Sequence, residues 1–589
     1  MAENWDDKSD DTQPMSSLET HALLAQLESE ALERVFTLPS VINKLDLSLN
    51  GGTQDFDTLW DNPHYVKFPC SSRNTYRLRT DPTNYLSKWQ LICTSLASEM
   101  SSSRDLENCI LSYSPSFVGQ WTFGSLHDFC AEIPPETTFW SVTLPFIARL
   151  AQNIEHLFSS PIPLLRSQIS AELTFSHEQC ASLIANMFFC TFPQRSCNSP
   201  HAGHGTGAYE NFPNVNFNTL YATNENVKRP NRRVQKLQCL VYYFETLAKE
   251  GIPSGKVSFR RSYIDDEPEA PLSLSVSVSS PKLGSITVGV SGSGVSTTTG
   301  AVKSPQWTLS TSPLLQPDLR VQGTIEDDGN SCWQADFANM MIGGGVIGAG
   351  CVQEEIRFVI NPECLVSRLI CEKMSPNEAV LIIGPQRYSK YSGYRDTFAW
   401  SGHYDDSKAK RDSKGRIMTY ITAIDAVSFP AMQAHRQFSR HYVHRELNKA
   451  YVGFMPSYDD LEISSLASSA TPSSSAFSVS ASPSTTIKRE DSTAKWPIAT
   501  GHWGCGAFNG DKHLKAIVQW MAASEAGRTL RYFAFGDEQF NQRFNDVVIR
   551  CLALKLSVGD LMQYTLSYRP GPKRNLFAWI LHCLSKIRK

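Results

Sequence analysis

The sequence has no excess of positive charge. Its 55 Lys and Arg residues are balanced by 58 Asp and Glu residues, a formal net charge of −3 over 589 residues. Proteins that coat DNA or RNA need a cationic surface, so this balance excludes that class and predicts no sequence-specific nucleic-acid binding. A polyanionic ligand would have to be recognised in a shaped pocket.

The sequence also lacks paired cysteines and long hydrophobic runs. Its 15 cysteines are an odd number with no Cys-x-x-Cys pair, which argues against a disulfide framework and a thiolate zinc site. No apolar run approaches the roughly 18 residues of a membrane helix. The acidic N-terminus is unlike a signal or transit peptide. We expect a soluble protein of the nucleus or cytoplasm with no membrane partner.

What is present is a globular composition, with 41% hydrophobic residues, in three regions. Residues 1–14 are acidic and polar, which predicts a disordered leader. Residues 15–255 have mainly helical patterns and predict an accessory domain, in which Ser176 is an expected N-cap. Strand and helix patterns alternate over residues 256–589 and predict an α/β catalytic domain, with a mixed sheet flanked by helices.

Two low-complexity stretches interrupt the α/β domain, near residues 270–312 and 461–496. The first is rich in Ser, Thr and Gly, and the second is rich in Ser with little charge, so neither can bury enough apolar surface to form a core. Outside them, buried strands are expected at residues 320–325, 333–338, 379–383, 418–424 and 530–535.

The most informative segment runs from Asp336 to Glu355. A strand ending near Asn339 leads into five glycines within eight residues, and glycine allows positive φ and close approach of backbone N–H groups to a ligand. The next helical stretch begins with Gln353, Glu354 and Glu355. Repulsion and partial burial would raise one carboxyl pKa, as a general acid requires, whereas a helix N-terminus would lower it. By spacing alone, a glycine-rich turn followed by solvated helix-start acids is an equally good interpretation.

A wider pattern decides between these interpretations. Three glycines (Gly343, Gly344 and Gly345), seven residues and then Gln-Glu-Glu resemble the signature of the poly(ADP-ribose) glycohydrolases. Further segments resemble that family in the same order: Phe217–Tyr221, Gly323–Asp327, Ala335–Asn339, Glu354–Phe358, Asn361–Glu363, Tyr391–Tyr394, Arg445–Tyr451, Trp503–Phe508 and Tyr532–Asp537. The resemblance covers roughly residues 180–570 and implies an ADP-ribose-binding macrodomain with an N-terminal helical accessory domain.

The resemblance implies hydrolysis of the ribose–ribose O-glycosidic bond of poly(ADP-ribose), mainly at the chain end, with no metal and no cofactor. The partner would be the polymer on modified proteins, and we expect a monomer. Glu355 would be the acid/base, protonating the leaving ribose hydroxyl and then deprotonating the attacking water. Glu354, Gln353 and Asn339 would bind ribose hydroxyls, and Asp336 would support them from the preceding strand.

The resemblance also assigns the adenosine end of the ligand. Ile325 and Glu326 would read the adenine edge, Phe535 would stack on adenine, and Tyr394 would line the pocket near the phosphates. Taken alone, Phe535 and Tyr394 would more often be core residues, because most aromatic side chains are.

Backbone amides of Gly506, Ala507 and Phe508 would hold the diphosphate, aided by the N-terminus of the next helix. His502 and Asn509 flank this loop and depart from the family, which commonly has Asn and Gly there. The effect of these departures on diphosphate binding is left open by the sequence.

Two other functions fit the sequence. A macrodomain could bind ADP-ribose or its polymer without cleaving it, although a binding-only module has no need of an acid/base at Glu355. A scaffold acting through its helical region and serine tract, with a vestigial pocket, is the second alternative. Release of ADP-ribose from the polymer distinguishes the hydrolase from both.

Overall fold

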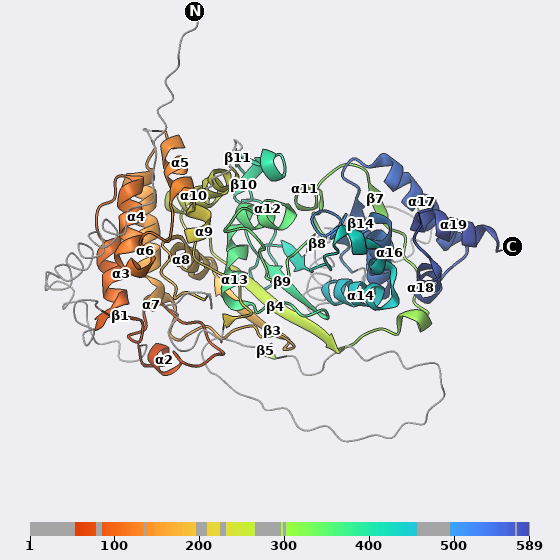
Figure 1. Ribbon diagram of the computed structural model, residues 1–589, viewed down its shortest axis with the longest axis horizontal. Helices are drawn as coiled ribbons and strands as arrows, with labels where there is room; N and C mark the ends of the chain where they lie inside the picture. The colour runs from red at the N-terminus through yellow and green to blue at the C-terminus, as the bar shows by residue number, and fades with distance from the viewer. Residues whose placement is uncertain are drawn as a thin grey trace, which may run out of the picture.

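The computed structural model describes residues 53–77, 85–134, 137–195, 209–223, 231–265, 296–297, 302–455, 495–571 and 574–587. The predicted leader (residues 1–14) and most of the two predicted insertions lie outside these residues. A helical region forms one end of the molecule, a ten-stranded sheet crosses the middle, and further helices form the other end (Figure 1).

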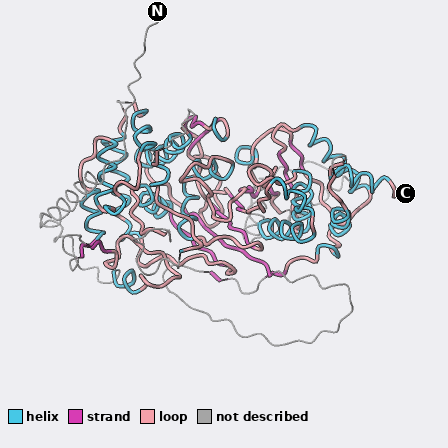
Figure 2. The backbone as a smooth tube through the Cα atoms, viewed as in Figure 1, coloured by secondary structure: helices cyan, strands magenta, loops and turns pink. Residues whose placement is uncertain are grey.

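The sheet is mixed and lies between helices (Figure 2). Its strand order is β5-β3-β4-β9-β12-β8-β13-β14-β7, and β6 pairs with β4. Five neighbouring strands run parallel: β12 (Tyr420–Ala423), β8 (Trp333–Asp336), β13 (Ile498–Thr500), β14 (Leu530–Phe533) and β7 (Asp318–Arg320). The antiparallel part contains β9 (Glu378–Ile383), β4 (Lys256–Asp265), β3 (Ala171–Ser176) and β5 (Ser296–Thr297), while β6 (Val302–Lys303) runs parallel to β4. This architecture confirms the predicted fold class.

Both faces of the sheet are buried. In β9, Val380 and Ile382 belong to one cluster of buried apolar residues, whereas Leu381 and Ile383 belong to another, as the alternation of side chains along a strand requires. The first cluster joins the sheet to α8 (His177–Phe188), α10 (Arg232–Glu250), α12 (Gln353–Ile360) and α13 (Val366–Ile370). The second joins it to α14 (Arg440–Phe454), α16 (Lys512–Glu525), α17 (Glu538–Ala553), α18 (Val558–Ser567) and α19 (Leu576–Ser585).

The helical region shares the first of these clusters. Besides α8 and α10 it contains α2 (Thr53–Thr58), α3 (Lys88–Leu96), α4 (Ser103–Ser112), α5 (Gly124–Glu132), α6 (Leu144–Gln152), α7 (Ile154–Leu157), α9 (Asn218–Tyr221) and the hairpin of β1 (Thr75–Arg77) and β2 (Tyr85–Ser87). Ser176 caps α8 as predicted: its hydroxyl accepts from Gln179 N–H at 3.0 Å, and the Gln179 side chain accepts from Ser176 N–H at 2.9 Å. The helical region therefore packs on the sheet through a common core.

Two predicted local structures differ from those observed. Residues 171–176 lie in a stretch predicted as mostly helical but form β3, because all six residues pair with β4. The strand expected at 320–325 ends at Arg320. Its continuation is prevented by Gly323, which has φ +106°, and by Thr324, which begins α11 (Ile325–Asp328) as its N-cap. The other four expected strands are present as β8, β9, β12 and β14.

Residues 302–312, at the end of the first predicted low-complexity stretch, belong to the folded structure. They contain β6 and Trp307, which is buried and donates its indole N–H to Asn448 at 2.7 Å. The Ser- and Thr-rich composition around Trp307 led to the prediction of a low-complexity stretch. The segment is ordered because one large aromatic side chain is buried and hydrogen-bonded.

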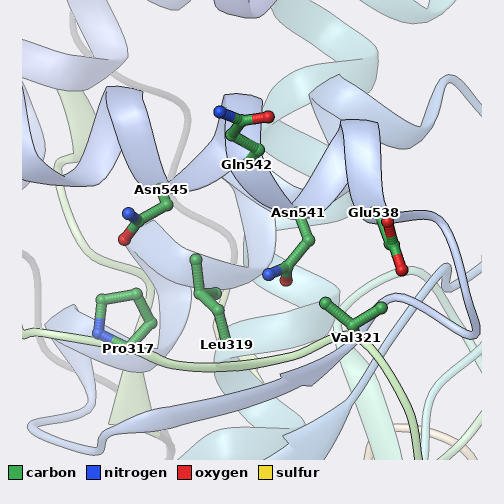
Figure 3. Close-up of a pocket in the computed structure, with 7 residues that line it drawn as sticks. All are labelled: Pro317, Leu319, Val321, Glu538, Asn541, Gln542 and Asn545. Carbon is green, nitrogen blue, oxygen red and sulfur yellow. The ribbon is translucent and has the colours of Figure 1, made fainter.

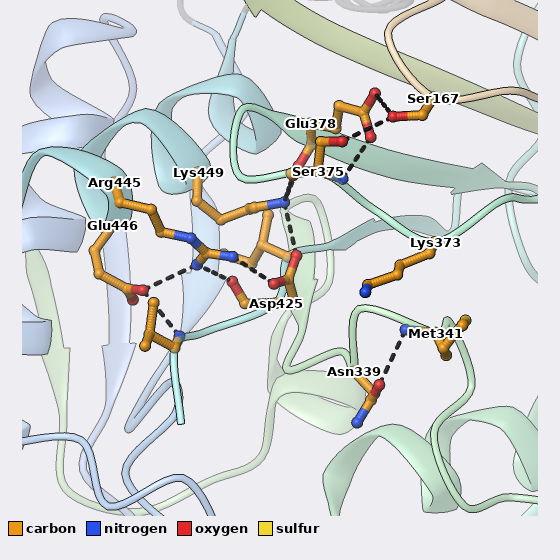
Figure 4. A network of polar contacts seen from close by, with 12 residues as sticks. Ser167, Asn339, Met341, Lys373, Ser375, Glu378, Asp425, Arg445, Glu446 and Lys449 are labelled. Atoms are coloured by element: carbon orange, nitrogen blue, oxygen red, sulfur yellow. Dashed lines mark hydrogen bonds and ion pairs between the residues drawn. The ribbon is translucent and has the colours of Figure 1, made fainter. Parts of the chain in front are cut away.

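A buried ion network ties α14 to the sheet (Figure 4). Asp425, two residues after β12, contacts Lys449 Nζ at 2.7 Å and Arg445 Nη2 at 2.5 Å. Lys449 also donates to the carbonyls of Ser375 at 2.6 Å and Glu378 at 2.5 Å. Burial alone would raise the pKa of Asp425, but the two cations hold it below its usual value. Arg445 and Lys449, which lie in a segment that carries the family resemblance, thus stabilise the fold.

Arg528 joins the chain on either side of residues 456–494. Its buried guanidinium donates to Phe454 O at 2.7 Å and Met455 O at 3.2 Å on one side, and to Trp496 O at 2.7 Å on the other. One side chain thus holds together the two points at which the predicted serine-rich insertion leaves and rejoins the described structure.

Candidate active site

Gln353, Glu354 and Glu355 occupy the first turn of α12, where the helix dipole favours negative charge. Both carboxylate oxygens of Glu355 accept backbone hydrogen bonds: Oε1 from Gly345 N–H at 2.8 Å and Oε2 from Val352 N–H at 2.8 Å. The side chain remains at the surface of a cleft while only 6% of its area is exposed. The backbone therefore fixes the orientation of this carboxyl group.

Glu354 and Gln353 connect α12 to the end of β8. Glu354 accepts from Gly343 N–H at 2.6 Å and from Asn339 N–H at 2.9 Å. Gln353 Oε1 accepts from Phe337 N–H at 2.7 Å, and its amide nitrogen donates to a β8 carbonyl at 3.1 Å. The three side chains are thus held in different directions by backbone groups of the segment that precedes them.

Asp336 is buried at the end of β8, and neither of its carboxylate oxygens has a hydrogen-bond partner among the described residues. Burial raises the pKa of Asp336 to about 8, with Arg357 opposing the rise and Glu355 adding to it. Burial, together with Asp336 and Glu355, also raises the pKa of Glu354 well above its usual value. Burial therefore favours the protonated form of Asp336 and Glu354, the two carboxyl groups beside Glu355.

The glycine-rich loop binds the carboxylates. Gly344 has φ +43°, and a Cβ there would stand 2.6 Å from Glu354 Oε2 and 2.7 Å from Glu355 Oε1. We expected the glycine N–H groups to approach a ligand, but those of Gly343 and Gly345 donate to Glu354 and Glu355. Glycine is needed here because the loop passes against two acidic side chains.

Two buried cations hold this loop from behind, and sequence reasoning missed both. Lys236 of α10 has its Nζ within hydrogen-bonding distance of the carbonyl oxygens of Gly345, Val346, Gly348 and Gly350, at 3.2, 2.8, 2.6 and 2.7 Å. Arg368 of α13 donates to Ile342 O at 2.9 Å and Gly344 O at 3.0 Å. Burial lowers the pKa of Lys236 to about 7 and that of Arg368 to about 10. A signal was present for Lys236, which lies at helical spacing with apolar Leu240 and Tyr243.

The acidic cluster opens into a cleft of about 1460 Å³. Eleven of the predicted site residues line it: Glu354, Glu355, Ile325, Glu326, Asn339, Gln353, Tyr394, Gly506, Ala507, Phe508 and Phe535. Asp336 and the three glycines Gly343, Gly344 and Gly345 do not line it and act from beneath. The structure thus brings side chains from distant parts of the sequence around one hollow.

Phe535 and Tyr394, the two cleft aromatics with an assigned ligand contact, are not core residues. Phe535 is 47% exposed and Tyr394 is 49% exposed, and Phe535 adopts φ +51°. Glu326 accepts a hydrogen bond from Tyr391 OH, and Tyr391 is a further cleft residue that the sequence analysis did not place in the site. Ile325 is buried beside Glu326. A flat ligand can stack on the ring of Phe535 while the carboxylate of Glu326 accepts hydrogen bonds from the polar edge of that ligand.

The loop between β13 and α16 leaves backbone donors free. The N–H groups of Gly506, Ala507 and Phe508 donate to no acceptor within the described residues. Asp511 is the N-cap of α16, accepting from Leu514 N–H at 2.9 Å. Unpaired N–H groups followed by a helix N-terminus are a common binding arrangement for phosphate.

The two departures from the family pattern have structural roles. His502 lines the cleft, and its Nδ1 lies 3.0 Å from Tyr532 OH. Asn509 adopts φ +56°, which glycine would adopt without strain, and its amide donates to Phe429 O at 2.9 Å. Asn509 therefore keeps the loop in a conformation that glycine also allows.

A second hollow of about 510 Å³ lies between β7 and α17 (Figure 3). It is lined by Pro317, Leu319, Val321, Glu538, Asn541, Gln542 and Asn545. Glu538 is the only titratable side chain of this set, so the hollow lacks an acid/base cluster. None of the predicted site residues borders it. Within the described residues, no helix is long and apolar enough to cross a membrane, and no group of three or more His, Cys, Asp or Glu side chains could hold a metal ion.

Comparison with known proteins matches two family models to this chain. The model described as "Poly (ADP-ribose) glycohydrolase (PARG), Macro domain fold" matches residues 304–542, and "Poly (ADP-ribose) glycohydrolase (PARG), helical domain" matches residues 134–261. These matched ranges contain the glycine-rich loop and Lys236, respectively.

Individual relatives agree with the family models. "Probable poly(ADP-ribose) glycohydrolase 2" of Arabidopsis thaliana is 30% identical over 475 residues, which cover 78% of this chain and 82% of that protein. "Poly(ADP-ribose) glycohydrolase 1" of the same plant is 30% identical over 479 residues, covering 74% of this chain and 78% of that protein. "Poly(ADP-ribose) glycohydrolase 1" of Caenorhabditis elegans is 29% identical over 426 residues, covering 70% and 42%.

Proposed function

The chain belongs to the poly(ADP-ribose) glycohydrolase family, and on that premise we propose that it hydrolyses ribose–ribose O-glycosidic bonds of poly(ADP-ribose) with Glu355 as acid/base. The observation that carries this proposal is the position of Glu355 at the surface of the cleft, with both oxygens held by backbone N–H groups. The relatives are named as glycohydrolases, which favours cleavage over binding alone.

In the proposed reaction, Glu355 gives its proton to the oxygen of the leaving ribose hydroxyl as the glycosidic C–O bond breaks. Positive charge develops on the anomeric carbon, and the ionised carboxylate stabilises it. Water then attacks this carbon and gives a proton back to Glu355, so that ADP-ribose and a shortened polymer leave and the acid is restored. One carboxyl group serves both steps, whereas most glycosidases use a separated pair.

Neighbouring groups are proposed to bind the reacting ribose. Asn339 lines the cleft, and its side-chain oxygen accepts from Met341 N–H at 3.0 Å, which orients the amide nitrogen as a donor for a ribose hydroxyl. Glu354 and Gln353 would contact the remaining hydroxyls. Asp336 is proposed to act indirectly, as a buried carboxyl that keeps a proton within the cluster.

The other end of the cleft is proposed to hold the adenosine diphosphate part of the unit. Phe535 would stack on adenine because its ring is half exposed, and Glu326 with Ile325 would contact the adenine edge. The free N–H groups of the Gly506–Phe508 loop would bind the diphosphate, with Tyr394 close by. Action mainly at the end of polymer on modified proteins, by a monomer in nucleus or cytoplasm, is proposed on family membership alone.

The test is release of ADP-ribose from purified poly(ADP-ribose) by the wild type and E355Q, with a chelator present. Glutamine keeps the size of the side chain and removes its titratable proton, so we expect E355Q to lose turnover while binding ADP-ribose within about threefold of the wild type. Turnover by E355Q near that of the wild type would refute the assignment. Binding of ADP-ribose without release by the wild type would support the binding-only alternative.

A further inference from the structure

The cleft carries more acidic than basic side chains, although its proposed substrate is a polyanion. Six acidic residues line it: Glu326, Glu354, Glu355, Asp396, Asp511 and Asp537. Its lining also includes three cations, Arg232, Arg395 and Lys512. Arg232 pairs with Asp396 at 3.1 Å, and Lys512 pairs with Asp537. Of these three cations only Arg395 has no ion-pair partner among the described residues, so its charge is available to a ligand.

The side chain of Arg395 extends to the opposite wall of the cleft. Arg395 follows Tyr394, between β10 (Ser389–Ser392) and β11 (Ala399–His403). Its Nη2 lies 3.7 Å from the point where a Cβ on Gly506 would stand. Gly506 belongs to the loop whose three consecutive N–H groups have no acceptor within the described residues. A guanidinium group and a set of free N–H donors therefore border the same space from two walls.

The backbone of Arg395 is held in an unfavourable conformation. Its φ is +55°, in the left-handed region, which residues with a Cβ rarely adopt. The turn is fixed on both sides: Arg395 N–H donates to Cys351 O at 3.1 Å, and Gly393, at φ +73°, has no room for a Cβ beside Thr397 O. Residues in such conformations are concentrated at ligand clamps, where the surrounding structure imposes them.

We propose that Arg395 binds the diphosphate of the ADP-ribose unit in the cleft and, together with the N–H groups of Gly506, Ala507 and Phe508, clamps it from two sides. The identity of the ligand rests on the proposed function. A guanidinium group presents a planar pair of donors that matches two phosphate oxygens, and the charge strengthens both hydrogen bonds. Arg395 thereby supplies the positive charge that an otherwise acidic cleft needs for a diphosphate.

The test is calorimetric binding of ADP-ribose, ADP and adenosine to the full-length wild type and three variants. R395G removes the guanidinium, and glycine accepts φ +55° without strain. We expect it to bind ADP-ribose and ADP about tenfold or more weakly and adenosine within about twofold of the wild type. The affinity of R395K for ADP-ribose and ADP should lie between those of the wild type and R395G, because lysine keeps the charge and loses the planar pair of donors. R543A is the matched control, since Arg543 is an exposed arginine of α17 outside the cleft.

The outcomes separate this proposal from the proposed function. Binding of ADP-ribose by R395G within about twofold of the wild type would overturn the clamp. An equal loss of adenosine binding would overturn it too, because it would indicate a distorted cleft. Failure of the wild type to bind ADP-ribose would overturn the proposed function itself, whereas loss of diphosphate binding confined to R395G and, in part, R395K would support both.

Discussion

Asp336 places a carboxyl group where neither oxygen finds a partner among the described residues. Burial raises its pKa from 3.8 to about 8. Between these two values the folded protein keeps a proton that the unfolded chain has released. The free energy of unfolding contributed by this residue is therefore largest below pH 3.8 and is lost progressively as the pH rises to about 8.

The variant D336N keeps the shape of the side chain and removes its titration. We expect the wild type to lose about 3–4 kcal/mol of stability relative to D336N as the pH rises from about 5 to about 8, because each pH unit between the two pKa values costs about 1.4 kcal/mol. Urea unfolding at a series of pH values measures the difference. The same pH dependence in both proteins would contradict the raised pKa of Asp336.

At the residue scale, the acidic cluster could be predicted because Asn339, Gln353, Glu354 and Glu355 are close in sequence. The helical spacing of Lys236 with apolar residues indicates its burial but not its partners, since the four carbonyl oxygens belong to a loop more than a hundred residues later. The cleft aromatics show the same limit. Local sequence does not distinguish an aromatic that stacks on a ligand from one that fills a core, and only exposure separates them.

At the scale of the element, the loop before α12 depends on one glycine more than on its neighbours. Gly344 faces both carboxylates, and a Cβ there would displace them. We expect G344A to lower the rate of polymer hydrolysis by about a hundredfold, the effect of moving a catalytic group by about 1 Å. Initial rates of ADP-ribose release measure it.

Gly348 of the same loop provides the matched control. It has no positive φ, and a Cβ there would meet only Gly345 O at 3.6 Å, an ordinary contact. G348A should therefore keep its rate within about threefold of the wild type, because no atom has to move. Equal losses in the two variants would show that the loop tolerates no side chain at all, and that the carboxylate contact at Gly344 is not the reason.

Helix caps were the elements most open to prediction. Ser176, Asp511 and Ser557 each accept from a backbone N–H three residues later, a local interaction that the sequence encodes directly. The short strand β3 was missed because its pairing with β4 joins residues far apart in sequence. Tertiary pairing outweighs local preference in strands of this length.

At the scale of the whole molecule, the contacts of Arg528 with the chain on either side of residues 456–494 predict that the fold does not depend on this segment. We expect replacement of this segment by a Gly/Ser linker of about eight residues to leave hydrolysis unchanged and to stabilise the protein by about 1 kcal/mol, because closing a shorter loop costs less entropy. Thermal unfolding and ADP-ribose release measure the two effects.

A Gly/Ser segment of the original length is the control for that experiment. It changes composition while keeping the loop length, so it should match the wild type in both measurements. Loss of activity in both variants would mean that specific residues of the serine-rich stretch act on the cleft. Loss of activity in the short variant alone would mean that the chain ends held by Arg528 need a longer linker between them.

The α/β class was predictable because the buried strands recur between helices with clear caps, and that alternation requires a sheet covered on both faces. The core that the helical region shares with the sheet was not predictable. Apolar faces on α8 and α10 indicate burial but do not indicate against what, and the structure shows that they pack with α12 and α13. The domain boundaries at residues 14 and 255 remain predictions.

The hydrogen bonds between Lys236 and the glycine-rich loop have a consequence for how the two regions evolve. The helical region supplies an apolar surface for α12 and the Nζ of Lys236, which lies within hydrogen-bonding distance of four carbonyl oxygens of the loop. A replacement region acquired by recombination would have to provide both at once. Gene rearrangements that separate the two regions should therefore leave a catalytic domain with an exposed apolar face and an unsupported glycine-rich loop, so we expect the two regions to be inherited together.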